Sequence, residues 1–122
     1  MSFNYYYKKE AEKYSFIRIP KVMMTEELFA SLSIQAKILY GLLLDRLSEA
    51  SKNKWIDDEN KVYVIYPIQE IMEDMNSSKS KAIKSLSELE DMGLVEKKHR
   101  GLGLPSLLYV KSFVVPETVP EV

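Results

Sequence analysis

The chain has 122 residues, 46% hydrophobic and 29% charged, which is typical of one soluble globular domain with a single core. It contains no cysteine, which excludes disulfides, thiolate metal sites and cysteine nucleophiles and suits a reducing cytoplasm. The formal net charge of −1 gives no general attraction for nucleic acid, so a DNA-binding function must depend on where the cations lie.

The N-terminal segment combines adjacent tyrosines with an alternating apolar pattern. The alternation before Pro20 predicts a short strand with an open edge. Three neighbouring tyrosines at a chain end are not expected to be buried together in a monomer. We therefore expect a homodimer interface, with the alternative that the tyrosines cover the domain's own core. The residues expected in the interface are Tyr5, Tyr6, Tyr7, Phe16, Ile17 and Ile19.

Two helices are expected next in the chain. Thr25 is a candidate N-cap for a short helix with Glu26 and Glu27 in its first turn. Ser33 begins the clearest helix, in which leucines and isoleucines recur at helical spacing as far as Leu47. Since the apolar stripe is wide, we expect this helix to be central to the core. Its strongly apolar part, Ile38–Leu44, is too short to cross a membrane.

The middle of the chain predicts a strand followed by two helices. Lys61–Tyr66 is rich in β-branched and aromatic residues, which favours a strand. Pro67 suits the start of a short helix over Ile68–Met75. Asn76, Ser77 and Ser78 form a turn with built-in N-caps, and a second helix should run to Met92 before Gly93.

The last elements form a β-hairpin. Strands are expected over 94–98 and 107–110, on either side of a glycine-containing loop. The sequence therefore predicts an α+β fold, a winged helix-turn-helix with a C-terminal β-hairpin wing and an extra N-terminal strand segment. We expect this domain to span residues 1–115. Residues 116–122 are acidic and proline-spaced, which is typical of a linker or a frayed tail, and a longer parent protein is one expectation that this segment leaves open.

The second helix of the predicted helix-turn-helix separates its charges. Ile83, Leu86 and Leu89 are expected to pack inward beside Ala82, with Glu88 on the opposite side. Between residues 77 and 87 there are three lysines and no acidic residue. The N-terminal half of such a helix approaches base edges and phosphates, so its positive charge stands where DNA binding would use it. The alternative is an ordinary solvated helix face.

The wing adds further cations beside a loop tip, where arginine is suited to phosphates or a narrow minor groove. The alternative is a solvated hairpin whose lysines protect an exposed edge. The residues expected to contact double-stranded DNA are Ser77, Ser78, Lys79, Ser80, Lys81, Lys84, Lys97, Lys98, Arg100, Gly101 and Gly103.

No constellation of catalytic or metal-binding residues is apparent. His99 is the only histidine, and Asp57-Asp58-Glu59 lacks the glycine and alternating ligands of a calcium loop. No serine lies in a nucleophile elbow. The sequence predicts a cytoplasmic protein that is not an enzyme and has no metal or cofactor.

Several motifs resemble the N-terminal domain of RepA-type plasmid replication initiators of Gram-positive bacteria. They are Phe16–Pro20, Leu32–Leu43, Val62–Tyr66, the run Ser78–Glu90 followed by Gly93-Leu94-Val95, the wing sequence Arg100–Pro105, and Leu108-Tyr109-Val110. The resemblance implies a winged-helix domain that binds repeated sites at a plasmid origin as a dimer. It also implies a missing C-terminal domain that recruits host replication proteins.

Three functions remain compatible with the sequence. The first is an origin-binding initiator domain, which the resemblance favours. The second is a winged-helix transcription regulator, which would share the fold and the DNA contacts. The third is a winged helix used only for protein–protein interaction, against which the lysine clusters and the wing arginine argue.

Overall fold

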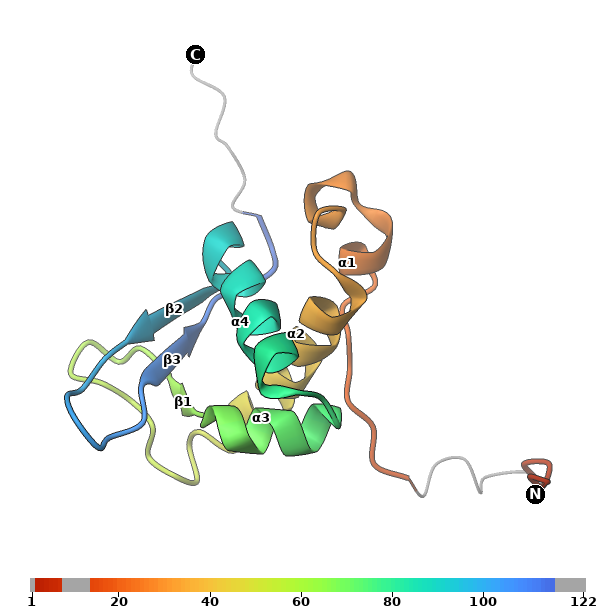
Figure 1. Ribbon diagram of the computed structural model, residues 1–122, viewed down its shortest axis with the longest axis horizontal. Helices are drawn as coiled ribbons and strands as arrows, with labels where there is room; N and C mark the ends of the chain where they lie inside the picture. The colour runs from red at the N-terminus through yellow and green to blue at the C-terminus, as the bar shows by residue number, and fades with distance from the viewer. Residues whose placement is uncertain (1, 8–13, 116–122) are drawn as a thin grey trace, which may run out of the picture.

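The computed structural model describes residues 2–7 and 14–115, arranged as helices beside a small sheet (Figure 1). In chain order the elements are α1 (Val22–Thr25), the 3₁₀ turn η2 (Glu27–Phe29), α2 (Ile34–Leu47), β1 (Val64–Ile65), α3 (Ile68–Met75), α4 (Lys79–Met92), β2 (Val95–Lys98) and β3 (Leu107–Val110). The predicted tail at 116–122 lies outside the described residues.

The three longer helices begin and end where local capping signals predict. Ser33 caps α2 by accepting the amide of Ala36, and Ser78 caps α4 by accepting the amide of Lys81. Asn76 ends α3 in the left-handed conformation, and Gly93 ends α4. The helix-turn-helix of α3 and α4 is therefore confirmed, and α2 packs against both as the third helix.

The sheet is antiparallel with the strand order β1-β3-β2. Strands β2 and β3 form the predicted hairpin, in which Val95 pairs with Val110 and Lys98 with Leu107. Strand β1 is shorter than expected, because Val62 pairs with Ile56 across a preceding loop instead of joining the sheet. Helix α4 packs against β2, so the elements form a winged helix-turn-helix whose wing projects from the helices (Figure 1).

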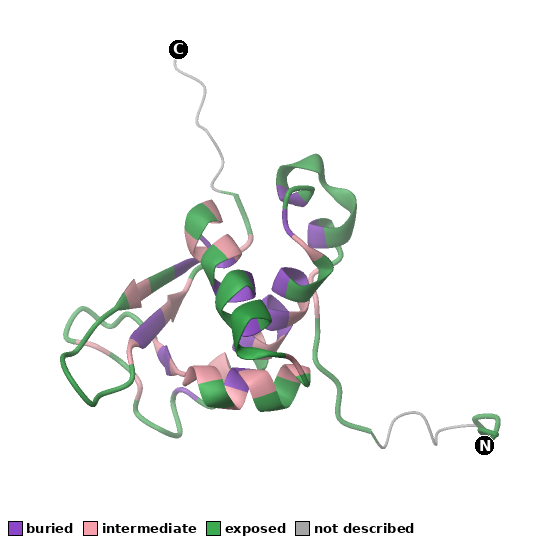
Figure 2. Ribbon diagram, in the orientation of Figure 1, coloured by how far each residue is buried: buried purple, intermediate pink, exposed green. Residues whose placement is uncertain are grey.

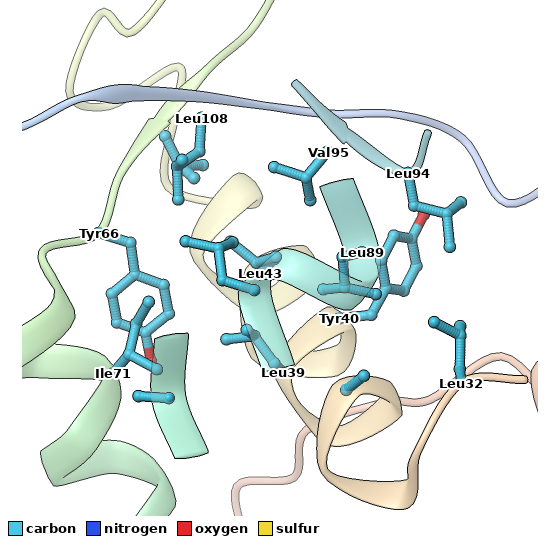
Figure 3. Close-up of a cluster of buried hydrophobic side chains, with 14 of the residues drawn as sticks. Leu32, Leu39, Tyr40, Leu43, Tyr66, Ile71, Leu89, Leu94, Val95 and Leu108 are labelled. Atoms are coloured by element: carbon cyan, nitrogen blue, oxygen red, sulfur yellow. The ribbon is translucent and has the colours of Figure 1, made fainter. Parts of the chain in front are cut away.

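The core lies where the three helices meet the inner face of the sheet. Figure 3 shows Tyr40 and Leu43 of α2 among Leu89 of α4 and Val95 of β2. Tyr40, Leu43 and Leu89 are fully buried. The Tyr40 hydroxyl donates to the carbonyl oxygen of Lys111 at 2.6 Å, so this polar group is satisfied inside the core. Burial raises the pKa of that hydroxyl, which stays protonated and able to donate.

A polar network that the sequence did not indicate connects α2, β1 and α3. The guanidinium of Arg46 lies 3.8 Å from the centre of the Tyr66 ring and donates to the carbonyl oxygen of Ile65. It also forms ion pairs with Glu70 and Asp74, and the Tyr66 hydroxyl donates to Asp74. The network fixes the start of the helix-turn-helix against the long helix α2.

Two expectations for the N-terminal part are wrong. Residues 15–20 form no strand and are not part of the β1-β3-β2 sheet. Instead, Ile19 and the Arg18 carbonyl pack against α2 at Gly41. Thr25 does not cap a following helix. It is the last residue of α1, and its hydroxyl donates back to the carbonyl oxygen of Lys21.

In the described part of the chain, no helix combines the length and the apolar character needed to span a bilayer.

Candidate nucleic-acid interface

A tight connection sets α4 across the end of α3. Asn76 has φ 49°, and the amide of Ser77 donates to the carbonyl oxygen of Met72 at 3.0 Å. Ser78 then starts α4, and its hydroxyl lies 3.2 Å from that of Ser80. Because the first amides of a helix have no partners within the helix, this end of α4 presents N–H donors and a positive dipole. Ser77, Ser78 and Ser80 thus lie together at the predicted position.

The buried side of α4 differs from the predicted one. Ala82, Ser85, Leu86 and Leu89 are buried, whereas Ile83 is 46% exposed. Ser85 occupies the core position because its hydroxyl donates to the carbonyl oxygen of Lys81 at 2.8 Å. The inward orientation expected for Ile83 is therefore wrong, and its side chain belongs to the outer face, much of which is exposed in Figure 2.

The lysines of α4 are exposed and uncommitted. Among the residues that the structure describes, Lys79, Lys81 and Lys84 form no ion pair and no side-chain hydrogen bond. Lys81 and Lys84 border a shallow hollow of about 130 Å³ together with Gln35. With no acidic partner in ion-pair contact, these ammonium groups are available to an external anion.

Glu88 has a structural role that the sequence reading missed. Its carboxylate accepts both the amide and the hydroxyl of Ser33, each at 2.8 Å. Ser33 is the N-cap of α2, so an acid on α4 secures the beginning of α2. Glu88 therefore orients α4 against α2, and the two residues are too far apart in the chain for local spacing to reveal the pair.

The wing cations are held differently from one another. Lys97 is half-buried, and its Nζ lies 3.7 Å from Glu90 Oε2 on α4. Lys98 is exposed. The Arg100 Nε–H donates to the carbonyl oxygen of Pro105 at 2.8 Å, which braces the loop across its base. Within the described residues the terminal guanidinium nitrogens of Arg100 make no contact of this kind, so they remain available.

Both predicted loop glycines occupy the left-handed region, with φ 111° at Gly101 and φ 79° at Gly103. No Cβ would meet a neighbour there, so these positions require glycine for backbone conformation rather than for space. Between them Leu102 is fully exposed at the tip. The two glycines therefore shape the wing, and any contact with DNA by their backbone remains a prediction.

Asp57 is occupied within its own loop. Its Oδ1 accepts the amides of Glu59 and Lys61, and its Oδ2 accepts the hydroxyl of Tyr109 at 3.0 Å. The amide of Lys61, above all, holds the pKa of this carboxyl below its ordinary value. Asp57 thus connects the loop before β1 to strand β3.

The residues expected at a dimer interface are largely exposed. Tyr5, Tyr6 and Tyr7 are 84%, 71% and 64% exposed, so the structure does not place them over the core. Phe16 and Ile17 are exposed too, whereas Ile19 is half-buried beside Gly41. Their role in a dimer stays a prediction.

A 41 kDa protein of Lactobacillus helveticus is 30% identical over 81 residues, which are 66% of this chain and 23% of that protein. The chain therefore spans about a quarter of that relative's length.

Three solved structures are similar throughout. The N-terminal domain of a DNA-binding protein is 37% identical, with a TM-score of 0.77 over 95% of this chain and 88% of that one. A Rep–DNA complex is 38% identical, with a TM-score of 0.77 over 93% and 88%. An MDR initiator is 32% identical, with a TM-score of 0.75 over 93% and 90%. The family model for the N-terminus of replication initiator protein A (RepA) matches residues 15–121, and the chain belongs to this family.

Proposed function

We propose that this domain binds double-stranded DNA in a sequence-specific manner at repeated sites of a plasmid replication origin, and so initiates plasmid replication. The observation that carries the proposal is the set of three exposed, unpaired lysines on the first half of α4. It is supported by 38% identity to a Rep protein solved with DNA and by membership of the initiator family.

In this proposal α4 lies in the major groove with its N-terminal half toward the bases. Lys79, Lys81 and Lys84 neutralise phosphates, and the hydroxyls of Ser77 and Ser80 contact the backbone or base edges. The braced guanidinium of Arg100 reaches a phosphate or a narrow minor groove beside it. Lys98 can join these contacts, whereas the ion pair with Glu90 gives Lys97 a part in holding the wing to α4.

The proposal extends to a homodimer in the cytoplasm. Two winged helices related by a two-fold axis match half-sites about one helical turn apart. The exposed tyrosines at 5–7 support an interface in the N-terminal segment. Because the chain spans a quarter of its curated relative, we assign the recruitment of host replication proteins to a further C-terminal domain.

Duplex selection tests the DNA-binding proposal. The domain is used to select bound duplexes from a random pool, and the preferred duplex is compared with an unrelated one by fluorescence anisotropy. The preferred duplex should bind at least tenfold more tightly, and its affinity should fall steeply as salt rises because phosphate contacts release counterions. Equal affinity for both duplexes at every salt concentration would contradict sequence-specific binding.

Analytical ultracentrifugation tests the dimer. We expect a dimer at micromolar concentration for the intact domain and a monomer after removal of residues 1–12. A monomer in both samples, with and without DNA, would refute the dimer. An unchanged dimer after the truncation would place the interface elsewhere, with α2 as the next candidate.

A further inference from the structure

Ile83 is an apolar side chain on a polar surface. Among the residues of α4, all of which the structure describes, it is the only large hydrophobic one that is exposed. The core stripe formed by Ala82, Leu86 and Leu89 is complete without it. The exposed part of Ile83 is therefore not needed for that stripe.

The position of Ile83 is set by a rigid element. It is the fifth residue of α4, about 6 Å along the helix axis from Lys79. Helical spacing makes Lys79, Ser80 and Ser87 its neighbours on the outer face, with Lys84 next in sequence. An isoleucine is thus framed by ammonium and hydroxyl groups in the half of the helix that approaches base edges.

A lone exposed apolar residue is ordinary on a protein surface. At this position, however, the major groove offers one specific apolar complement, because the C5 methyl group of thymine projects there beside hydrogen-bonding groups. The lysines around Ile83 suit the phosphates on either side of the groove. Charge and apolar surface on this face therefore fit one occupant, a thymine-containing duplex.

On the basis of the proposed DNA binding, we propose that Ile83 is a specificity residue that packs against the C5 methyl group of a thymine. The contact excludes water from both apolar groups, which favours thymine over cytosine at that base pair. The flanking lysines add affinity for any sequence, whereas Ile83 distinguishes one base from another.

Deoxyuridine substitution tests the assignment without altering the protein. Each thymine of the selected duplex is replaced in turn by deoxyuridine, which pairs identically and lacks the methyl group. At one thymine or more, the replacement should weaken binding by about fourfold, the change expected for one buried methyl group at about 0.8 kcal/mol. Ile83→Ala should bind the thymine and deoxyuridine duplexes equally.

The matched control is Ile56→Ala, because Ile56 is also 46% exposed but lies in the loop before β1. This variant should retain the full preference for thymine. If the unmodified domain ignores every deoxyuridine, or if Ile83→Ala retains the preference, the assignment is overturned while DNA binding stands. If the domain selects no duplex at all, the proposed function fails and the assignment fails with it.

Discussion

Helix α4 and the wing both carry cations, but the two regions hold them in different ways. On α4 the lysines extend from a helix whose opposite side is buried, and the described residues give them no acidic partner. On the wing, Lys97 pairs with Glu90, and Arg100 uses one nitrogen to brace its own loop. The helix therefore supplies charge on a rigid support, whereas the wing uses part of its charge to keep its shape.

The largest loss of stability is expected when a buried side chain of α4 is truncated. Leu89→Ala leaves a cavity beneath α4, because Leu89 is fully buried, and should lower the free energy of unfolding by about 2–5 kcal/mol. Urea denaturation measures the change. The control is Leu102→Ala at the exposed wing tip, which should change stability by less than about 0.5 kcal/mol. A similar decrease in the free energy of unfolding for the two variants would contradict the difference drawn between the buried side of α4 and the exposed wing.

Replacing two unpaired lysines of α4 should weaken DNA binding without changing the stability of the domain. Lys81→Gln with Lys84→Gln removes two phosphate contacts, so the salt slope of binding should fall by about two. At 0.15 M salt the affinity should drop by about 30-fold. Anisotropy titrations across a salt series give both values. The matched control, Lys52→Gln with Lys54→Gln in the exposed loop after α2, should leave the slope unchanged. A slope unaffected by the α4 variant would remove these lysines from the interface.

Arg100→Ala should weaken binding to the preferred duplex by about 1.5 kcal/mol if the guanidinium reaches the minor groove. It also removes the brace to Pro105, so the loop becomes less ordered. Arg100→Lys retains the charge but not the bonding pattern of the guanidinium, and it should recover only part of the affinity. Parental affinity in Arg100→Ala would exclude the wing arginine from DNA contact.

Loss of the α4 cap is a smaller perturbation of the same helix. Ser78→Ala removes the acceptor of the Lys81 amide and should reduce stability by about 1 kcal/mol. Ser78→Asp should retain the capping bond and the stability, while its negative charge should weaken DNA binding. Thermal melts and titrations of the two variants together separate capping from electrostatics. Equal DNA affinity in the two variants would indicate that this end of α4 is remote from phosphates.

The smallest effect concerns pH and the loop before β1. Because the pKa of Asp57 is lowered in the folded state, its stabilising contribution is present above the unfolded value of about 3.9 and is lost as pH falls through the folded value. Asp57→Asn should therefore show a shallower loss of melting temperature than the parent between pH 5 and pH 3. Parallel acid profiles would show that this carboxylate is uncoupled from folding.

The sequence predicted the structural features that depend only on residues close together in the chain, such as the ends of the helices. Ser33, Ser78 and Gly93 mark helix ends because capping is local. The hydrophobic pattern predicted that Ile83 faces the core, which is wrong. Ser85 is buried on that side of α4 instead, because its hydroxyl donates to a carbonyl of its own helix. The pair of Glu88 and Ser33 joins residues 55 positions apart, so no local spacing could reveal it.

The N-terminal strand illustrates the same limit. Alternation at residues 16–19 describes the side chains, but a strand also needs a neighbouring edge with unpaired amides and carbonyls. The sheet edges lie on β1 and β2, whereas Arg18 and Ile19 of this segment pack against α2 at Gly41. Helix-turn-helix order predicted that the serines and lysines at the start of α4 share one exposed end of the helix, and their contact with DNA stays a prediction. The ion pair of Lys97 with Glu90 and the hydrogen bond of Arg100 to Pro105 arise from the folded wing, and no local sequence pattern predicts them.

Gly41 lacks a side chain, and the segment at Arg18 and Ile19 packs closely against α2 at this position. A Cβ at this position would lie 3.0 Å from Ile19 Cγ1 and 3.1 Å from the Arg18 carbonyl oxygen. Alanine would favour the helix by about 1 kcal/mol, but the backbone at Arg18 would have to move aside to accept it. The absence of a side chain at residue 41 therefore lets Arg18 and Ile19 pack directly against α2. An alanine there would require Ile19 and the Arg18 carbonyl to shift by a few tenths of an ångström.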